Sequence, residues 1–154
     1  MTSPTGPERP ESPEQAALYD AVGAEHAAIY GYGVVSAYSL PTRNELISEA
    51  MAQHRERRES LVAMLAARDI PAPLPAAGYQ LPMPVGPPPE AARLAVRIED
   101  DGAVAGRGVV EQSEPDEDRR VALTALTQCA VLAARWRRVI GAWPGTRAFP
   151  GSSE

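Results

Sequence analysis

The sequence predicts an all-α fold, a four-helix bundle built from two antiparallel hairpins joined by a long proline-rich crossover. Of the sixteen prolines, four lie in residues 1–13 and eight in residues 71–89, and regular helix is excluded there because proline lacks an amide proton. The remaining chain carries apolar residues at the three- to four-residue spacing of amphipathic helices. Only 5% of the residues are aromatic, so small side chains must fill the core and the helices can pack closely.

The first predicted hairpin is bounded by two capping signals. Residues 12–15, Ser-Pro-Glu-Gln, form a capping box with proline at the first helical position, so the first helix begins there and runs to about Ser39. Leu40-Pro41 stops it, and residues 42–45, Thr-Arg-Asn-Glu, supply a second capping box. The second helix ends near Arg68. Because the connection between these two helices is short, they should be antiparallel.

The second predicted hairpin follows a run of three prolines. Its first helix is expected after Pro87-Pro88-Pro89, and its second, after a break at residues 113–115, should end near residues 141–144. The first of these helices contains three glycines, each of which costs about 1 kcal/mol relative to alanine in a helix interior. These glycines, Gly102, Gly106 and Gly108, could instead permit close contact with another helix.

The crossover, residues 69–89, fixes the relative direction of the hairpins. In a polyproline-like form, residues 71–89 alone cover about 60 Å at ~3.1 Å per residue, whereas a helix of about 27 residues is only ~40 Å long. The crossover can therefore run the length of the bundle, which makes the second and third helices parallel. We expect Leu74, Tyr79, Leu81 and Met83 to pack against the bundle. The domain is then residues 13–143, with a disordered tail at 1–12 and a second tail at 144–154.

Charge and cysteine content exclude several classes of function. A net charge of −5 argues against a general nucleic-acid binder, because such affinity comes from a surplus of cationic contacts. All fifteen basic residues are arginine, which is typical of a GC-rich bacterial genome. The single cysteine, Cys129, excludes an intramolecular disulfide. Neither a signal sequence nor a run of ~18 apolar residues is present, so we expect no membrane partner and a soluble, cytoplasmic protein.

One stretch and one histidine extend the pattern toward a known family. EHAAIYGYG, residues 25–33, begins with Glu25 and His26 near the middle of the first helix, and His54 lies on the apolar stripe of the second. With the hairpin, crossover and hairpin layout, the chain resembles the ferritin-like superfamily over roughly residues 13–143, and in particular the actinobacterial DUF4439 family. Di-iron members of that superfamily place a Glu on each of two helices and a Glu-x-x-His pair on each of the others.

The ligand set implied by this resemblance is incomplete here. Glu25 can stand in the place of the first glutamate, but Met51 lies three residues before His54, so no Glu-x-x-His pair exists. The third helix offers Asp101 and the fourth only Gln128. A di-iron site would be short of ligands, so we expect no metal and no cofactor. If a metal is present, iron or another divalent cation bound by Glu25, His54 and Asp101 is the alternative.

The same residues predict a buried polar cluster. Arg58 lies one turn after His54, so its positive charge should reach the level of Glu25 and Asp101. Buried carboxylates cost several kcal/mol unless they are paired, and an arginine with an imidazole could satisfy them without metal. His26 lies about 100° around the helix from Glu25, so we expect Glu25 to face inward and His26 to lie at the boundary. The predicted cluster is Glu25, His54, Arg58, Asp101 and Gln128.

Three functions follow from these features. The first is a non-catalytic binding or assembly module that lacks a complete di-iron ligand set, and the second is a metal-binding protein or metal-dependent oxidoreductase. The third is a protein-interaction module that uses the crossover or the acidic tail. No nucleophile arrangement or glycine-rich phosphate loop supports hydrolysis or nucleotide binding, so enzyme activity stays open with the balance against it. Gly102 and Gly106 share a helix face, from which we expect either a homodimer or close packing inside the monomer.

Overall fold

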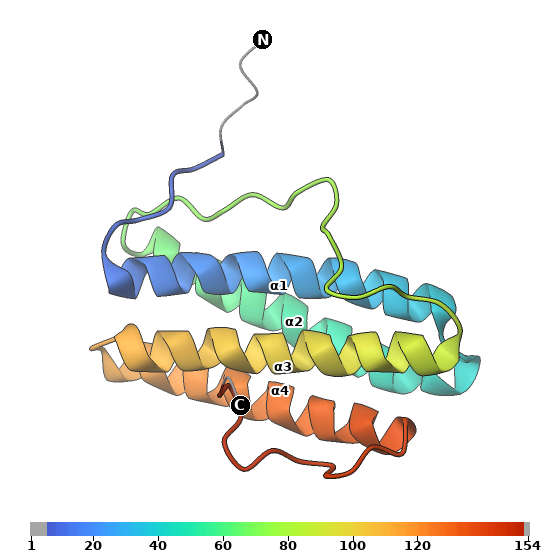
Figure 1. The fold of residues 1–154 in the computed structure, drawn as a ribbon. Helices are drawn as coiled ribbons and strands as arrows, with labels where there is room; N and C mark the ends of the chain where they lie inside the picture. The colour runs from blue at the N-terminus through green and yellow to red at the C-terminus, as the bar shows by residue number, and fades with distance from the viewer. Residues whose placement is uncertain (1–5, 153–154) are drawn as a thin grey trace.

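Four long helices make up the fold in the computed structural model, which describes residues 6–152. In chain order they are α1 (Pro13–Tyr38), the short 3₁₀ turn η1 (Pro41–Arg43), α2 (Asn44–Ala66), α3 (Pro88–Gln112) and α4 (Asp116–Val139). Helices α1 and α2 form one antiparallel hairpin, α3 and α4 form the other, and α2 and α3 run in the same direction (Figure 1). The prediction of an all-α four-helix bundle with two hairpins and one long crossover is confirmed.

The helix starts follow proline, but the predicted capping boxes do not form. Helices α1 and α3 begin at Pro13 and Pro88, where the fixed φ of proline suits a first helical position. Ser12 occupies the N-cap of α1, yet its side chain makes no capping hydrogen bond. Before α2, the 3₁₀ turn uses backbone carbonyls instead, with the Arg43 amide donating to Leu40 at 2.9 Å. The turn removes the need for a side-chain cap, so α2 begins at Asn44, one residue later than the predicted N-cap at Thr42 implies.

The crossover, residues 67–87, runs back over α1 (Figure 1). Leu81 and Met83 pack against the core as predicted, and the Tyr79 ring lies 5.7 Å from that of Tyr30. The prediction for Leu74 is wrong, because this side chain is 70% exposed. At this point the neighbouring carbonyl of Pro73, and not the leucine, faces α1.

Both terminal segments contact the bundle where the structure describes them. The Arg9 guanidinium pairs with Asp20 of α1 at 2.6 Å, and the Tyr19 hydroxyl donates to the Pro7 carbonyl at 2.5 Å. After α4, the chain folds back, so that Arg147 lies 3.5 Å from the Asp100 carboxylate of α3. The rest of the predicted tails, residues 1–5 and 153–154, lies outside the described residues.

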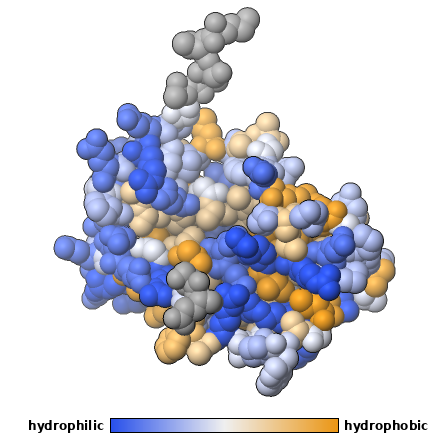
Figure 2. Space-filling view, viewed as in Figure 1, coloured by the Kyte–Doolittle hydropathy of each residue, from blue (hydrophilic) through white to orange (hydrophobic). Residues whose placement is uncertain are grey.

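Two of the three glycines of α3, Gly102 and Gly106, serve close packing inside the chain. A Cβ added at Gly102 would lie 2.8 Å from Cys129 Sγ, and one added at Gly106 would lie 3.2 Å from the backbone of α4. The shared glycine face therefore receives α4, so it is not free to receive a second copy. The face of the molecule seen in Figure 2 is largely hydrophilic, with separate apolar patches. Within residues 6–152, no helix has both the length and the apolar character that crossing a bilayer requires.

Candidate functional site

A polar layer crosses the centre of the bundle and divides the apolar core into two clusters. Toward one end lie twelve buried residues that include Tyr32 and Trp136, and toward the other lie seven that include Leu18 and Leu65. All four helices contribute polar side chains to the layer at matching depths. Its members are Glu25 of α1, His54 and Arg57 of α2, Glu99 of α3, and Gln128 and Cys129 of α4.

His54 lies between two carboxylates and is fully buried. Its Nδ1 is 2.6 Å from Glu25 Oε2, and its Nε2 is 3.2 Å from Glu99 Oε1. A nitrogen can approach a carboxylate oxygen this closely only with a proton between them, because both atoms would otherwise be acceptors. The geometry therefore favours an imidazolium, with each ring nitrogen donating to a different helix.

Arg57 supplies the second positive charge of the layer. Its Nε donates to Glu25 Oε1 at 3.0 Å, its Nη1 donates to Gln128 Oε1 at 2.8 Å, and its Nη2 donates to Cys129 Sγ at 3.4 Å. Nη2 also lies 2.9 Å from His54 Nδ1. Since the Nδ1 proton is directed at Glu25, we assign the Nη2 donation to the sulfur. One guanidinium thus ties α2 to α1 and α4.

A chain of hydrogen bonds extends the layer toward one end of the bundle. The Trp136 indole Nε1–H donates to the Tyr32 hydroxyl at 2.9 Å, and that hydroxyl donates to Glu99 Oε1 at 2.5 Å. Glu99 Oε1 therefore accepts from both Tyr32 and His54, whereas its Oε2 has no hydrogen-bond partner among residues 6–152. The fully buried aromatic residues thus connect the end of the bundle to the charged centre.

The surroundings shift the pKa values of four groups in the layer. Burial alone would lower the pKa of His54, but its hydrogen bonds to Glu25 and Glu99 outweigh burial and raise it. Burial also lowers the pKa of Arg57, and the nearby Cys129 and Glu25 outweigh this and raise it. Burial, followed by the charge of Glu99, raises the pKa values of the Tyr32 hydroxyl and the Cys129 thiol well above their ordinary ranges. Tyr32 and Cys129 are therefore neutral at neutral pH, where Tyr32 donates to Glu99 and the Cys129 sulfur accepts from Arg57.

These protonation states balance the layer. Glu25 and Glu99 supply two carboxylates, Arg57 supplies one guanidinium, and His54 in its protonated form supplies the second positive charge. The charged side chains are between 0% and 9% exposed, so solvent screens them little. Each charge in the layer thus depends on its partners rather than on water.

The structure brings together three of the five residues predicted for the cluster. Glu25, His54 and Gln128 meet in the layer, whereas Arg58 and Asp101 lie outside it. Arg58 pairs with its neighbour Glu59 at 2.8 Å at the surface, and the exposed Asp101 pairs with Arg97 of its own helix at 2.9 Å. In the layer, Arg57 takes the place predicted for Arg58, and Glu99 takes the place predicted for Asp101.

The difference is one of helical phase. Arg57 lies three residues after His54 and four before Leu61, in step with the buried face of α2, whereas Arg58 lies about 100° further around. On α3 the sequence interpretation followed a single stripe through Ile98 to Asp101. Helix α3 contacts both α1 and α4, so it buries two faces, and Glu99 lies on the face shared with Gly102. A search for ionisable residues in phase with the α3 glycines would have found Glu99.

His26 lies at the boundary of the bundle, as the sequence interpretation proposed. Its Nε2 lies 3.0 Å from the carbonyl oxygen of Pro73 in the crossover, and because that oxygen can only accept, Nε2 donates the proton. Glu25, its neighbour, points into the polar layer instead. The adjacent pair thus performs two tasks, because Glu25 completes the charged centre and His26 attaches the crossover.

The residues of the layer do not fit a metal ion. A di-iron or mononuclear site needs several carboxylate or imidazole ligands that converge on one point, and both nitrogens of His54 instead lie within hydrogen-bond distance of carboxylates. The Arg57 guanidinium occupies the space between Glu25, Gln128 and Cys129. Within residues 6–152, no three His, Cys, Asp or Glu side chains form a group that could hold a metal ion.

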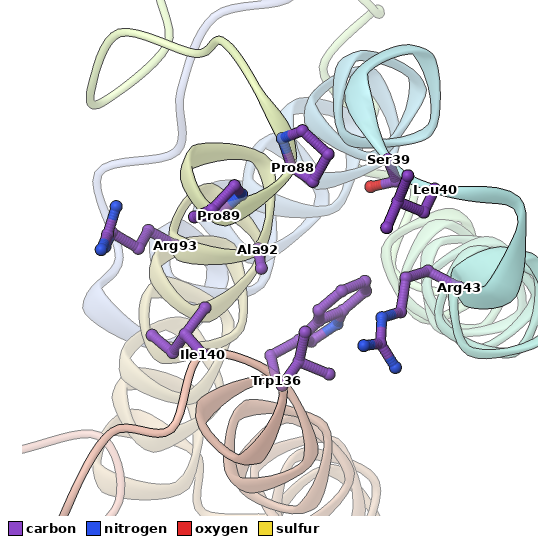
Figure 3. Close-up of a pocket in the computed structure, with 10 residues that line it drawn as sticks. Ser39, Leu40, Arg43, Pro88, Pro89, Ala92, Arg93, Trp136 and Ile140 are labelled. Atoms are coloured by element: carbon purple, nitrogen blue, oxygen red, sulfur yellow. The ribbon is translucent and has the colours of Figure 1, made fainter.

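Two hollows adjoin this network. A groove of about 250 Å³ separates α2 from α4, which contact each other little, and Arg57 and Gln128 form part of its wall. A second pocket of about 250 Å³ lies at the end of the bundle where α1, α3 and α4 meet (Figure 3). Its lining is mainly apolar, and Trp136 forms its floor beside Arg43. The hydrogen-bond chain therefore connects an accessible pocket to the buried charges.

The fold and the layer define an all-α four-helix bundle with a buried ionic centre. The sequence matches the family described as "Domain of unknown function (DUF4439)" over residues 17–154, and the chain belongs to this family. It is also similar to a solved structure, that of the conserved hypothetical protein rv2844 from Mycobacterium tuberculosis. The two share 58% sequence identity with a TM-score of 0.84, over 90% of this chain and 98% of the other. No curated protein matches the sequence.

Proposed function

We propose that this protein is a ferritin-like four-helix bundle that acts as a non-catalytic binding or assembly module. The single observation that supports this proposal is the position of Arg57, whose guanidinium donates to Glu25, Gln128 and Cys129. A divalent cation would compete with the guanidinium for the same space and the same lone pairs. The central layer then stabilises and orients the helices, and binding takes place at the hollows of the bundle.

The alternative function is that of a metal-binding protein or metal-dependent oxidoreductase. The observation that favours it is the approach of Glu25, His54 and Glu99 from three helices, since these residue types are common metal ligands. To hold a metal, the layer would have to lose a proton from His54 and displace Arg57. Both changes leave the carboxylates without their present hydrogen bonds, so we favour the first function.

Metal titration with an oxidation assay separates these functions. The protein is titrated anaerobically with Fe²⁺, Mn²⁺ and Zn²⁺ in a calorimeter, and the Fe²⁺ sample is then exposed to oxygen while oxygen consumption is recorded. We expect no saturable binding and no consumption above the buffer rate. One equivalent of bound metal that is lost in Glu25→Ala and His54→Ala, but kept in the surface control Asp101→Ala, would replace our proposal with a metal centre.

A homodimer in the cytoplasm is the setting we propose for this module. Because the α3 glycines pack against α4, the support for a dimer now comes from the outer face of α4, where Leu123 and Val131 are 56% and 54% exposed. These side chains lie about two turns apart on one face, so a second copy could cover both. Light scattering after size exclusion at micromolar concentration should return a dimer mass that Leu123→Glu converts to a monomer mass. A monomer mass for the unaltered chain would remove the dimer from the proposal.

A further inference from the structure

We infer that the pocket at the end of the bundle binds a small apolar carboxylate. The carboxylate would pair with Arg43, and the apolar body would lie among Leu40, Pro88 and Ile140, above the buried Trp136 indole (Figure 3). This inference rests on the proposed function of a binding module and gives its ligand a chemical class.

The shape of the pocket suits a small apolar body. Its volume of about 250 Å³ lies below the roughly 300–1,000 Å³ of sites for drug-sized ligands. Leu40, Pro88, Ala92 and Ile140 surround the opening above the Trp136 indole (Figure 3). The Trp136 indole lies buried beneath these lining residues, and its Nε1–H is already donated to Tyr32, so the floor of the pocket has no free donor. A flat or branched hydrocarbon group therefore matches this lining.

Arg43 gives the pocket an unpaired positive charge. All but four of the fifteen arginines have a carboxylate oxygen within 4.0 Å inside residues 6–152. The exceptions are Arg43, Arg55, Arg93 and Arg138, and two of them, Arg43 and Arg93, line this pocket, which contains no acidic residue. Arg43 is also half-buried and makes no side-chain hydrogen bond to the described residues. A guanidinium so placed is partly removed from water without a compensating partner, which an anionic ligand would supply.

The surrounding groups favour a carboxylate over a phosphate. In Figure 3, Arg43 extends toward Trp136, whereas Arg93 points away from the pocket. One guanidinium is thus available, and its planar fork matches the two oxygens of a single carboxylate. Helix α3 begins at this pocket with Pro88 and Pro89, which have no amide protons to offer a phosphate. The pocket can therefore neutralise one negative charge more readily than two.

The test follows the two tryptophan indole signals by NMR during a titration with 2-naphthoate. Trp136 forms the floor of the pocket, and Trp143, which is 93% exposed and outside the lining, is the internal control. We expect a saturable shift of the Trp136 signal with a dissociation constant of about 1 mM or below, and a constant Trp143 signal. Arg43→Gln should weaken binding roughly ten- to a hundredfold, because a charge-assisted bond is lost. Arg55→Gln, which removes an unpaired arginine elsewhere, should leave binding unchanged.

Neutral and doubly charged probes decide the ligand class. 2-Naphthamide should bind at least tenfold more weakly than 2-naphthoate, and 2-naphthyl phosphate should bind no more tightly. Equal binding of the amide would overturn the carboxylate assignment while keeping a binding pocket, and tighter binding of the phosphate would assign a phosphate instead. A Trp136 signal that shifts with protein concentration alone would assign the pocket to a second copy. A Trp136 signal that none of the probes moves would refute the inference, whereas the proposed function is judged separately by the metal titration.

Discussion

Replacing Arg57 with methionine should destabilise the fold strongly. The substitution keeps an apolar stem but removes the donors to Glu25, Gln128 and Cys129. It leaves Glu25 and Glu99 with one positive charge, that of His54, in a layer almost closed to solvent. Breaking a buried ion pair by removing one partner costs about 3–5 kcal/mol. The loss of two charge-assisted hydrogen bonds at about 1.5–3 kcal/mol each gives a similar figure.

Urea denaturation measures this cost, with Arg58→Met as the matched control. Within residues 6–152, Arg58 pairs only with its exposed neighbour Glu59, so its removal should change the free energy of unfolding by no more than about 0.5 kcal/mol. At about 2–4 °C per kcal/mol, Arg57→Met should lower the melting temperature by roughly 6–20 °C. Combining it with Glu25→Gln should recover part of the loss, because the stranded carboxylate is then neutral. An Arg57→Met variant within about 1 kcal/mol of Arg58→Met would refute the assigned role of this residue.

Three further predictions concern packing, pH and the amino-terminal segment. Gly102→Ala should cost about 1–3 kcal/mol of unfolding free energy, because its Cβ would lie 2.8 Å from Cys129 Sγ, and Cys129→Ala should relieve the cost. A Cβ added at Gly108 would meet nothing within 4 Å, so Gly108→Ala should raise the free energy of unfolding by about 0.5–1 kcal/mol. Equal effects of the two glycine variants in urea denaturation would contradict this packing. Because the pKa of His54 is raised in the folded state, the stabilisation from its charge is complete below about pH 6.5 and is lost as the pH rises through the folded-state pKa. Urea denaturation of the unaltered chain and of His54→Gln over a series of pH values would show this loss. Deleting residues 1–11 removes an exposed ion pair and one hydrogen bond, so calorimetry should show cooperative unfolding with a midpoint only a few degrees lower. A larger drop would mean that this segment stabilises the bundle through more than these two contacts.

The fold was predictable because its boundaries depend on local chemistry. Proline sets the start of α1, the start of α3 and the length of the crossover, and each effect needs only a few neighbouring residues. The capping box before α2 failed because backbone carbonyls in a 3₁₀ turn compete with side-chain oxygens for the same amides, whereas nothing in the structure explains the missing cap at Ser12. The exposure of Leu74 depends on a contact between Pro73 and His26, which lies forty-seven residues away and leaves no local signal.

The site was predictable in its level along the bundle and less so in its members. Glu25, His54 and Gln128 lie at the same depth along the bundle when each hairpin is antiparallel. The predicted lengths and directions of the helices were therefore enough to bring these residues to one level. Choosing Arg57 over Arg58 requires the helical phase to within one residue. Choosing Glu99 over Asp101 requires knowing that α3 packs against two neighbours, which only the assembled bundle provides.

The protonation of His54 tests the central claim, that an arginine and an imidazolium balance the buried carboxylates, most directly. In a ¹⁵N-labelled sample, NMR reports whether each ring nitrogen carries a proton. The contacts of Nδ1 with Glu25 and of Nε2 with Glu99 predict that both nitrogens are protonated at pH 6, with a titration midpoint above the 6.5 of a free imidazole. An unprotonated nitrogen at pH 6, above all one whose signal moves with one equivalent of Zn²⁺, would contradict the account.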